Sequence, residues 1–153
     1  MMNKEQKKQY ISDMSTQFDK SEAVIVTHYQ GLTVSQLDEL RKQMREHGIK
    51  FKITNNRITK LALEKTRCKD LSDLFSGPTA VAMSEDAITS AKILTKFSKE
   101  NQNLKILGGI MGSDVLDVAG VQNVATLPSL DEARAKIVGI LRSPAQKIAS
   151  ILL

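Results

Sequence analysis

Residues Lys50 to Lys69 read KFKITNNRITKLALEKTRCK. The first five alternate polar and apolar side chains, which is the pattern of a half-buried strand, so Phe51 and Ile53 are expected to face a core. The polar side chains expected to face away from it are those of Lys50, Lys52 and Thr54. Asn55 and Asn56 follow, and their side-chain oxygens suit the capping position of a helix. Beyond them the apolar residues recur at helical spacing, so the stretch predicts a strand that leads directly into a helix.

The same stretch holds most of the excess positive charge of the chain. It contains seven Lys or Arg residues and one acid, Glu64, for a net charge of +6, whereas the whole chain carries +5. All other positions hold 15 of the 22 basic residues and 16 of the 17 acidic ones. A run of charge is commonly just a solvated surface. However, amides at a helix N-terminus bind anions, and clustered Lys and Arg bind phosphate backbones by releasing counterions. The charge at this junction therefore favours a nucleic-acid partner.

The side chains expected to contact the nucleic acid surround this junction. They are Lys52, Asn55, Asn56, Arg57 and Lys60, with Arg45 of the preceding helix as a flank. Lys7 and Lys8 form a second basic cluster, which a solvated helix end would also explain. Aromatic residues make up only 4% of the chain and Trp is absent. Stacking of aromatic side chains on unpaired bases is therefore not expected to be the main mode of nucleic-acid binding. Structured RNA or a duplex, recognised through backbone and shape, fits this composition better.

Predicted helices and strands alternate along most of the chain. A capping box at Thr33 and Gln36 starts one helix, and Gly48 suits its end. The other expected helices lie at residues 3–20, 71–75 (a short turn) and 84–99, and the other expected strands at 23–26, 79–83, 104–107 and 115–116. The alternation predicts the α/β class, a layered domain with flanking helices. Its sheet is expected to be mixed because the last turn resembles a hairpin. Gly108 and Gly109 indicate a bulge or a close approach of two backbones.

A boundary near Pro128 divides the chain into an α/β domain, residues 1–127, and a helical tail, residues 128–153. Ser129 and Glu132 have the spacing of a second capping box, so the tail helix is expected to begin there.

The tail ends in a strongly apolar segment. Ser143-Pro144 is expected to restart the helix, since Ser suits a cap and Pro the first turn. Ile148, Ile151 and Leu152 follow on one helical face, and such a face would be an aggregation liability if it stayed uncovered. Two interpretations remain open. The segment folds back on its own domain, or it docks as a helix in a groove of another protein.

The sequence contains no recognisable catalytic or metal-binding motif. His28 and His47 belong to no metal-ligand pattern, and no phosphate-binding glycine loop occurs. A single cysteine, Cys68, cannot form an intramolecular disulfide. We therefore expect no metal, no cofactor and no enzymatic role, and a small enzyme using Cys68 or a histidine is the alternative from that class. No apolar run follows Met1, so neither a signal peptide nor a membrane span is expected.

Several motifs, in order along the chain, resemble those of a known family. They are Tyr29-Gln30-Gly31-Leu32-Thr33-Val34, Leu40-Arg41, Gly48 before Phe51, Asn56-Arg57 with Leu61-Ala62, Gly77-Pro78-Thr79-Ala80, Gly108-Gly109 and Leu127-Pro128-Ser129. Each motif is weak alone. The ordered set covers essentially the whole chain, and it is similar to the bacterial family of the tenth protein of the large ribosomal subunit.

The resemblance implies a non-enzymatic, cytoplasmic protein of the ribosome without membrane contact. Its α/β domain would bind large-subunit ribosomal RNA at the GTPase-associated region, beside a neighbouring ribosomal protein. Its tail would anchor dimers of the acidic stalk protein, which recruit translation GTPases. An assembly factor that binds the same RNA site without stalk dimers is the alternative among binding proteins.

Two features depart from the family pattern. The family junction typically reads hydrophobic, basic, Asn, Thr or Arg, Leu, so Asn55 replaces the usual basic residue. Phosphate contacts are therefore expected chiefly from Lys52, Arg57 and Lys60. Family tails generally continue for further helical segments, each of which seats one dimer, whereas residues 143–153 resemble only the first. The expectation is either a short tail or a sequence that is a piece of a longer chain.

Overall fold

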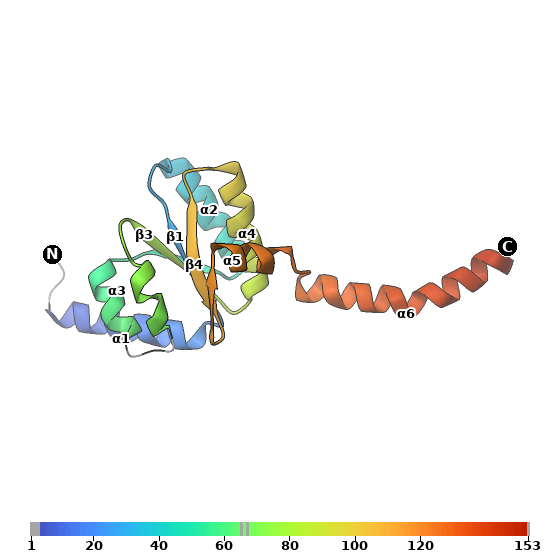
Figure 1. Cartoon of the computed structure of the whole chain (residues 1–153), viewed down its shortest axis with the longest axis horizontal. Coiled ribbons are helices and arrows are strands. Elements are labelled where there is room, and N and C mark those ends of the chain that lie inside the picture. The colour runs from blue at the N-terminus through green and yellow to red at the C-terminus, as the bar shows by residue number, and fades with distance from the viewer. Residues whose placement is uncertain (1–3, 65, 67, 153) are drawn as a thin grey trace.

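Five strands pair into one sheet within residues 4–64, 66 and 68–152, which are the residues that the computed structural model describes. The strands are β1 (Ala23–His28), β2 (Lys50–Ile53), β3 (Thr79–Ser84), β4 (Lys105–Met111) and β5 (Asp114–Asp117). The helices are α1 (Lys4–Lys20), α2 (Val34–Glu46), α3 (Asn56–Leu63), α4 (Ala87–Glu100), α5 (Val118–Thr126) and α6 (Leu130–Leu152), with a 3₁₀ turn, η1 (Lys69–Leu74). The predicted α/β class is confirmed (Figure 1). Lys65 and Arg67 of the basic stretch lie outside the described residues.

The sheet has the order β2-β3-β1-β4-β5, and its neighbouring strands are all antiparallel. The prediction of a mixed sheet is therefore wrong. Helix α2 connects β1 and β2, which run in the same direction, but β3 lies between them. In the same way β1 lies between β3 and β4, which α4 connects. Each crossover is a split β-α-β unit, and the alternation of elements in a sequence does not reveal the inserted strand.

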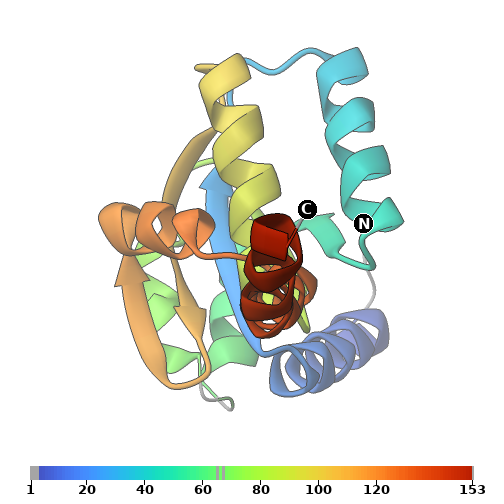
Figure 2. The ribbon, with the colours of Figure 1, turned by 90° about the vertical axis from the view of Figure 1, so that its right-hand side faces the viewer.

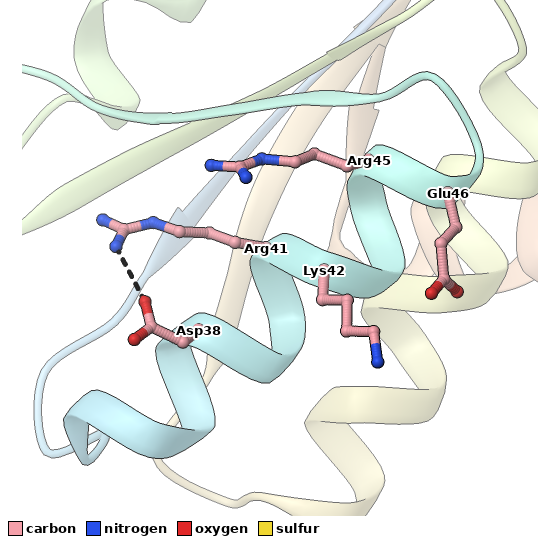
Figure 3. A pocket seen from close by; sticks show the side chains of 5 residues that line it. All are labelled: Asp38, Arg41, Lys42, Arg45 and Glu46. Atoms are coloured by element: carbon pink, nitrogen blue, oxygen red, sulfur yellow. Dashed lines mark hydrogen bonds and ion pairs between the residues drawn. The ribbon is translucent and has the colours of Figure 1, made fainter.

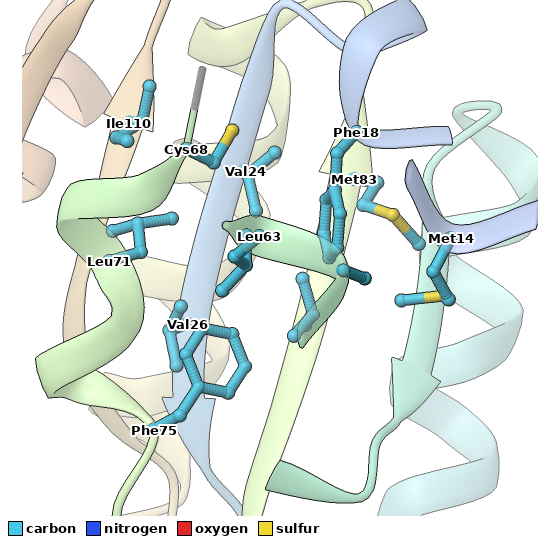
Figure 4. Close-up of a cluster of buried hydrophobic side chains, with 12 residues drawn as sticks. Met14, Phe18, Val24, Val26, Leu63, Cys68, Leu71, Phe75, Met83 and Ile110 are labelled. Atoms are coloured by element: carbon cyan, nitrogen blue, oxygen red, sulfur yellow. The ribbon is translucent and has the colours of Figure 1, made fainter. Parts of the chain in front are cut away.

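Helices cover both faces of this sheet, so the sheet separates two apolar cores. Helices α1 and α3 and the turn η1 cover one face, where large side chains including Phe18, Leu63 and Phe75 pack together (Figure 4). Helices α2, α4 and α5 cover the other. Side chains alternate along β1, since Val26 belongs to the first core and Ile25 to the second. Both faces of β1 are buried, which explains its continuous apolar sequence.

A β-bulge in β4 keeps both cores filled. Leu107 is an extra residue, because its neighbours Ile106 and Gly108 pair with two consecutive residues of β1. An extra residue reverses the alternation of side chains. Ile106 consequently lies in the core under α2 and α4, whereas Ile110 lies in the core under α1 and α3. The irregularity predicted at Gly108 and Gly109 is confirmed.

Strand β2 forms one edge of the sheet, and its burial differs from the prediction. Phe51 is half-buried as expected for a residue that faces a core, but Ile53 is 40% exposed. Thr54, expected to face away, is only 8% exposed. The alternating pattern predicts two opposite sides but not how far each helix layer extends over the edge.

The C-terminal region contains two further departures. Helix α5 is not among the predicted elements, although Val118, Val121 and Val124 have helical spacing. Helix α6 continues through Ser143-Pro144, where a restart is predicted. A proline inside a helix removes one hydrogen bond and favours a bend, and the ribbon of α6 changes direction along its length (Figure 1). The helix leads away from the sheet and its flanking helices (Figures 1 and 2).

Candidate nucleic-acid interface

Asn55 starts α3 directly after β2, as predicted. Its backbone is extended, with φ −84° and ψ 116°, and its side chain accepts a hydrogen bond from the amide of Arg57. The N–Oδ1 distance is 3.3 Å. Its carbonyl accepts the amides of Ile58 and Thr59. The cap satisfies amides that would otherwise lack partners at the helix start. It holds the first turn of α3, with the exposed Arg57 side chain, at the end of the edge strand.

The side chain of Asn56 forms hydrogen bonds within the protein. Its Nδ2 donates to the carbonyl of Gly77 at 2.7 Å, and its Oδ1 accepts the hydroxyl of Thr79. The same turn is held from β1, where Nε2 of His28 donates to the carbonyl of Ser76 at 2.6 Å. Both polar atoms of the Asn56 amide are therefore engaged, and the residue positions α3 against the turn before β3.

Three basic side chains around this junction have no acidic partner in the described part of the chain. Arg57 and Lys60 are exposed on α3, and Lys52 is half-buried on β2 with its Nζ 3.2 Å from Oε1 of Gln17 in α1. Among the described residues, none of these three lies within 4.0 Å of a carboxylate oxygen. The predicted contacts at Lys52, Arg57 and Lys60 thus share one side of the β2 edge.

Lys7 and Lys8 lie on the same side. They are exposed on α1, which packs against α3, and Oγ of Ser15 donates to the carbonyl of Ala62 at 3.2 Å. The helix pair brings the second basic cluster onto the face of the sheet that carries Arg57.

Two arginines approach the β2 edge from the other side. Arg41 and Arg45, one turn apart on α2, extend in parallel, whereas Lys42 and Glu46 point elsewhere (Figure 3). Oδ1 of Asp38 lies 3.2 Å from Arg41, and Arg45 has no ion pair with a described residue. The two arginines line a hollow of about 230 Å³ with Ile49, Lys50, Phe51 and Lys52. The sequence predicts Arg45 as a flank but not this hollow, which needs the packing of α2 beside β2.

The base of the tail is tied to α4 through Glu132. Oε2 of Glu132 accepts the amide of Ser129 at 3.0 Å, and the Glu132 amide donates to Oγ of Ser129 at 3.4 Å, so the second capping box is confirmed. The same Oε2 atom lies 2.8 Å from Nζ of Lys92 in α4. The hydrogen bond from Lys92, and then the one from Ser129, holds the pKa of the Glu132 carboxyl below its ordinary value.

Helix α6 exposes large aliphatic side chains one turn after this base. Ile137, Val138, Ile140 and Leu141 are 54–75% exposed. Eleven residues complete about three helical turns, so residues 137 and 141 lie one such repeat before residues 148 and 152 of the predicted docking segment. Those predicted residues, Ile148, Ile151 and Leu152, have helical backbones, but their side chains lie outside the described part of the chain. Docking is predicted only for residues 143–153, although aliphatic residues at the same spacing begin at Ile137.

The alternative of a small enzyme depends on Cys68 or a histidine. Cys68 is 4% exposed within the core beneath α1 and α3, which is a poor position for a nucleophile. In the described part of the chain, no three His, Cys, Asp or Glu side chains gather closely enough to hold a metal ion. No helix within that part combines the length and the apolarity needed to cross a membrane.

Comparisons with known proteins identify the family of this chain. The family model of ribosomal protein L10 matches residues 2–99. The large ribosomal subunit protein uL10 of Pelagibacter ubique is 74% identical over 152 residues, which is 99% of this chain and 92% of that protein. The uL10 of Rhodospirillum rubrum is 47% identical over 150 residues, 98% of this chain and 87% of that protein. That of Paramagnetospirillum magneticum is 48% identical over 148 residues, 97% of this chain and 86% of that protein. The chain therefore belongs to the ribosomal protein L10 family.

Proposed function

We propose that this chain, a structural constituent of the large ribosomal subunit, binds large-subunit ribosomal RNA at the GTPase-associated region and anchors acidic stalk-protein dimers on its tail. The observation that carries the RNA half is the placement, at the exposed β2–α3 junction, of basic side chains that form no ion pair with a described residue. Seven of the 22 basic residues of the chain lie between Lys50 and Lys69. Cations held without acidic partners attract phosphate, and they gain affinity when counterions leave the RNA.

Within the proposed RNA site the residues have different roles. Lys52, Arg57 and Lys60 contact phosphates, with Lys7, Lys8 and Arg45 around them. Asn55 and Asn56 act mainly by fixing the start of α3, because Asn55 caps it and Asn56 binds Gly77. A neighbouring ribosomal protein of the same region would share the remaining surface.

The stalk half rests on the exposed aliphatic stripe of α6. Leaving Ile140 and Leu141 in water, at 70% and 75% exposure, forgoes burial worth about 1.5–3 kcal/mol per side chain. Arg134, Lys136 and Arg142 are exposed on the same helix and suit an acidic partner. Ile148, Ile151 and Leu152 would extend this stripe. A groove-forming dimer that covers it would act by the helix-in-groove mode.

Binding of purified components tests the proposal. The chain should bind a transcript of the GTPase-associated region and, at a separate site, purified acidic stalk dimers. It should also sediment with mature large subunits in a lysate. Presence on immature particles alone, without uptake of dimers, would support the assembly factor instead. Failure to bind the transcript under conditions in which the chain is folded would contradict the RNA half.

A further inference from the structure

The β2 edge separates two groups of basic side chains that lie on opposite faces of the sheet. Lys52 pairs with Val81, whose side chain belongs to the core beneath α1 and α3, so Lys52 points to that face. Its contact with Gln17 of α1 agrees with this direction. Arg57 comes four residues after the last residue of β2 and is exposed on α3, which covers the same face. We call Lys52, Arg57 and Lys60 the α3 side.

Arg41 and Arg45 form the other group, which we call the α2 side. Helix α2 covers the opposite face, where its Leu40 and Met44 are buried. The guanidinium groups extend beside one another, away from Lys42 (Figure 3). The hollow that they line reaches across to Lys50 and Lys52 of the edge strand. Strand β2 therefore has cations on both flanks, with α2 and α1 on either side of it in Figure 2.

Most of these cations have no carboxylate partner among the described residues. Arg41 alone has a carboxylate partner, and both Arg41 and Asp38 of that pair are substantially exposed. Such a pair contributes little in water. Arg45, Lys50 and Arg57 have no ion pair with a described residue. Arginine forks suit phosphate oxygens in particular. Two groups of basic side chains thus lie on opposite sides of the β2 edge.

We propose that the β2 edge enters between two phosphate backbones of a folded RNA, so that the α2 side binds one strand and the α3 side binds the other. The inference rests on the proposed function, and it adds that the RNA must present two facing backbones, as a duplex groove or a helical junction does. A single backbone could satisfy one group but would leave the other solvated. RNA is favoured over a protein partner because the hollow on the α2 side shares Lys50 and Lys52 with the proposed RNA junction.

The test compares three variants that each remove one exposed cation. Arg45→Ala changes the α2 side, Arg57→Ala changes the α3 side, and Lys42→Ala is the matched control on α2. All three residues are exposed, so folding should persist, and circular dichroism checks this. The probe is a transcript of the GTPase-associated region. Hydroxyl-radical footprinting maps its protected backbone, and titrations at several salt concentrations give the salt slope of binding.

Arg45→Ala and Arg57→Ala should each lower the salt slope by about one unit. The first should lose protection on one strand and the second on the facing strand, while Lys42→Ala should match wild type. The inference is overturned if Arg45→Ala behaves like Lys42→Ala, or if both arginine variants expose the same strand. In those cases the proposed function survives through Arg57. Absence of wild-type binding would overturn both.

Discussion

Nδ2 of Asn56 donates to the carbonyl of Gly77 at 2.7 Å, and this bond joins the start of α3 to the turn before β3. The hydroxyl of Thr79 completes the amide's bonding at Oδ1. Asn56, which the sequence predicts as an RNA contact, therefore has both polar atoms of its side chain bonded within the protein, and we propose that it supports the RNA contacts beside it. The distinction can be measured, because a support affects stability and RNA affinity together.

Asn56→Ala should destabilise the fold by about 1–3 kcal/mol, since it leaves the buried Thr79 hydroxyl and the Gly77 carbonyl without their partner. RNA affinity should fall as well, because Arg57 loses its fixed position. Thermal denaturation and RNA titration measure the two effects. Loss of RNA affinity with unchanged stability would instead indicate a direct contact.

Gly109→Ala should destabilise the protein by more than Gly139→Ala does. A Cβ on Gly109 would lie 2.7 Å from the carbonyl oxygen of Val24, so two hydrogen-bonded strands would have to separate. A Cβ on Gly139 meets nothing within 4 Å, and alanine favours a helix there by about 1 kcal/mol. Denaturant unfolding of both variants tests this. Equal stabilities would contradict the close approach of β1 and β4.

Lys92→Met should loosen the base of α6 against α4. Spin labels at Lys99→Cys and Lys136→Cys, in a Cys68→Ala background, report the distance between the two helices. We expect a broader distance distribution in Lys92→Met. Lys96→Met, which removes a lysine of α4 that has no ion pair with a described residue, should leave the distribution unchanged. Equal distributions in all variants would show that the ion pair does not hold the tail.

Lowering the pH should loosen the base of α6 against α4, as Lys92→Met does. The pKa of Glu132 is lowered in the folded protein, first by the hydrogen bond from Lys92. Because its folded-state pKa is lowered, the Glu132 carboxylate stabilises the base of α6 fully above its unfolded-state pKa, which is about 4.3. This stabilisation is lost as the pH falls through the folded-state pKa. The broadening should therefore appear below about pH 4.3 in wild type. The distance distribution of Lys92→Met should already be broad at neutral pH.

Ile148→Asp or Leu152→Asp should abolish binding of acidic stalk dimers and leave RNA affinity nearly unchanged. A charge within an apolar docking stripe is costly to bury. Ala135→Asp adds the same charge on the opposite face of α6, so it should bind dimers as wild type does. Titration with purified dimers checks all three. Retained binding in both stripe variants would remove this segment as the docking site.

Local chemistry in the sequence predicts local structure well in this protein. The capping pairs at Thr33 with Gln36 and at Ser129 with Glu132, and the cap at Asn55, all appear in the structure. These interactions span three residues or fewer, so their spacing in the sequence is enough to define them.

Relationships between distant segments are what the sequence does not show. The insertion of β3 between β1 and β2 makes the sheet antiparallel, and nothing in either strand's own pattern encodes it. The internal role of Asn56 depends on Gly77, 21 residues away. The position of Arg45 across the edge from Arg57 depends on how α2 packs beside β2. Charge counts locate the basic stretch but do not show that basic side chains lie on both faces of the sheet at the β2 edge.

The salt dependence of RNA binding by wild type and Arg57→Ala tests the central claim most directly. The claim is that unpaired cations at the β2–α3 junction bind phosphates of large-subunit ribosomal RNA. We predict weaker binding by Arg57→Ala and a salt slope that is smaller by about one unit, with the fold unchanged. An affinity and a slope equal to those of wild type, measured on folded protein, would contradict the account.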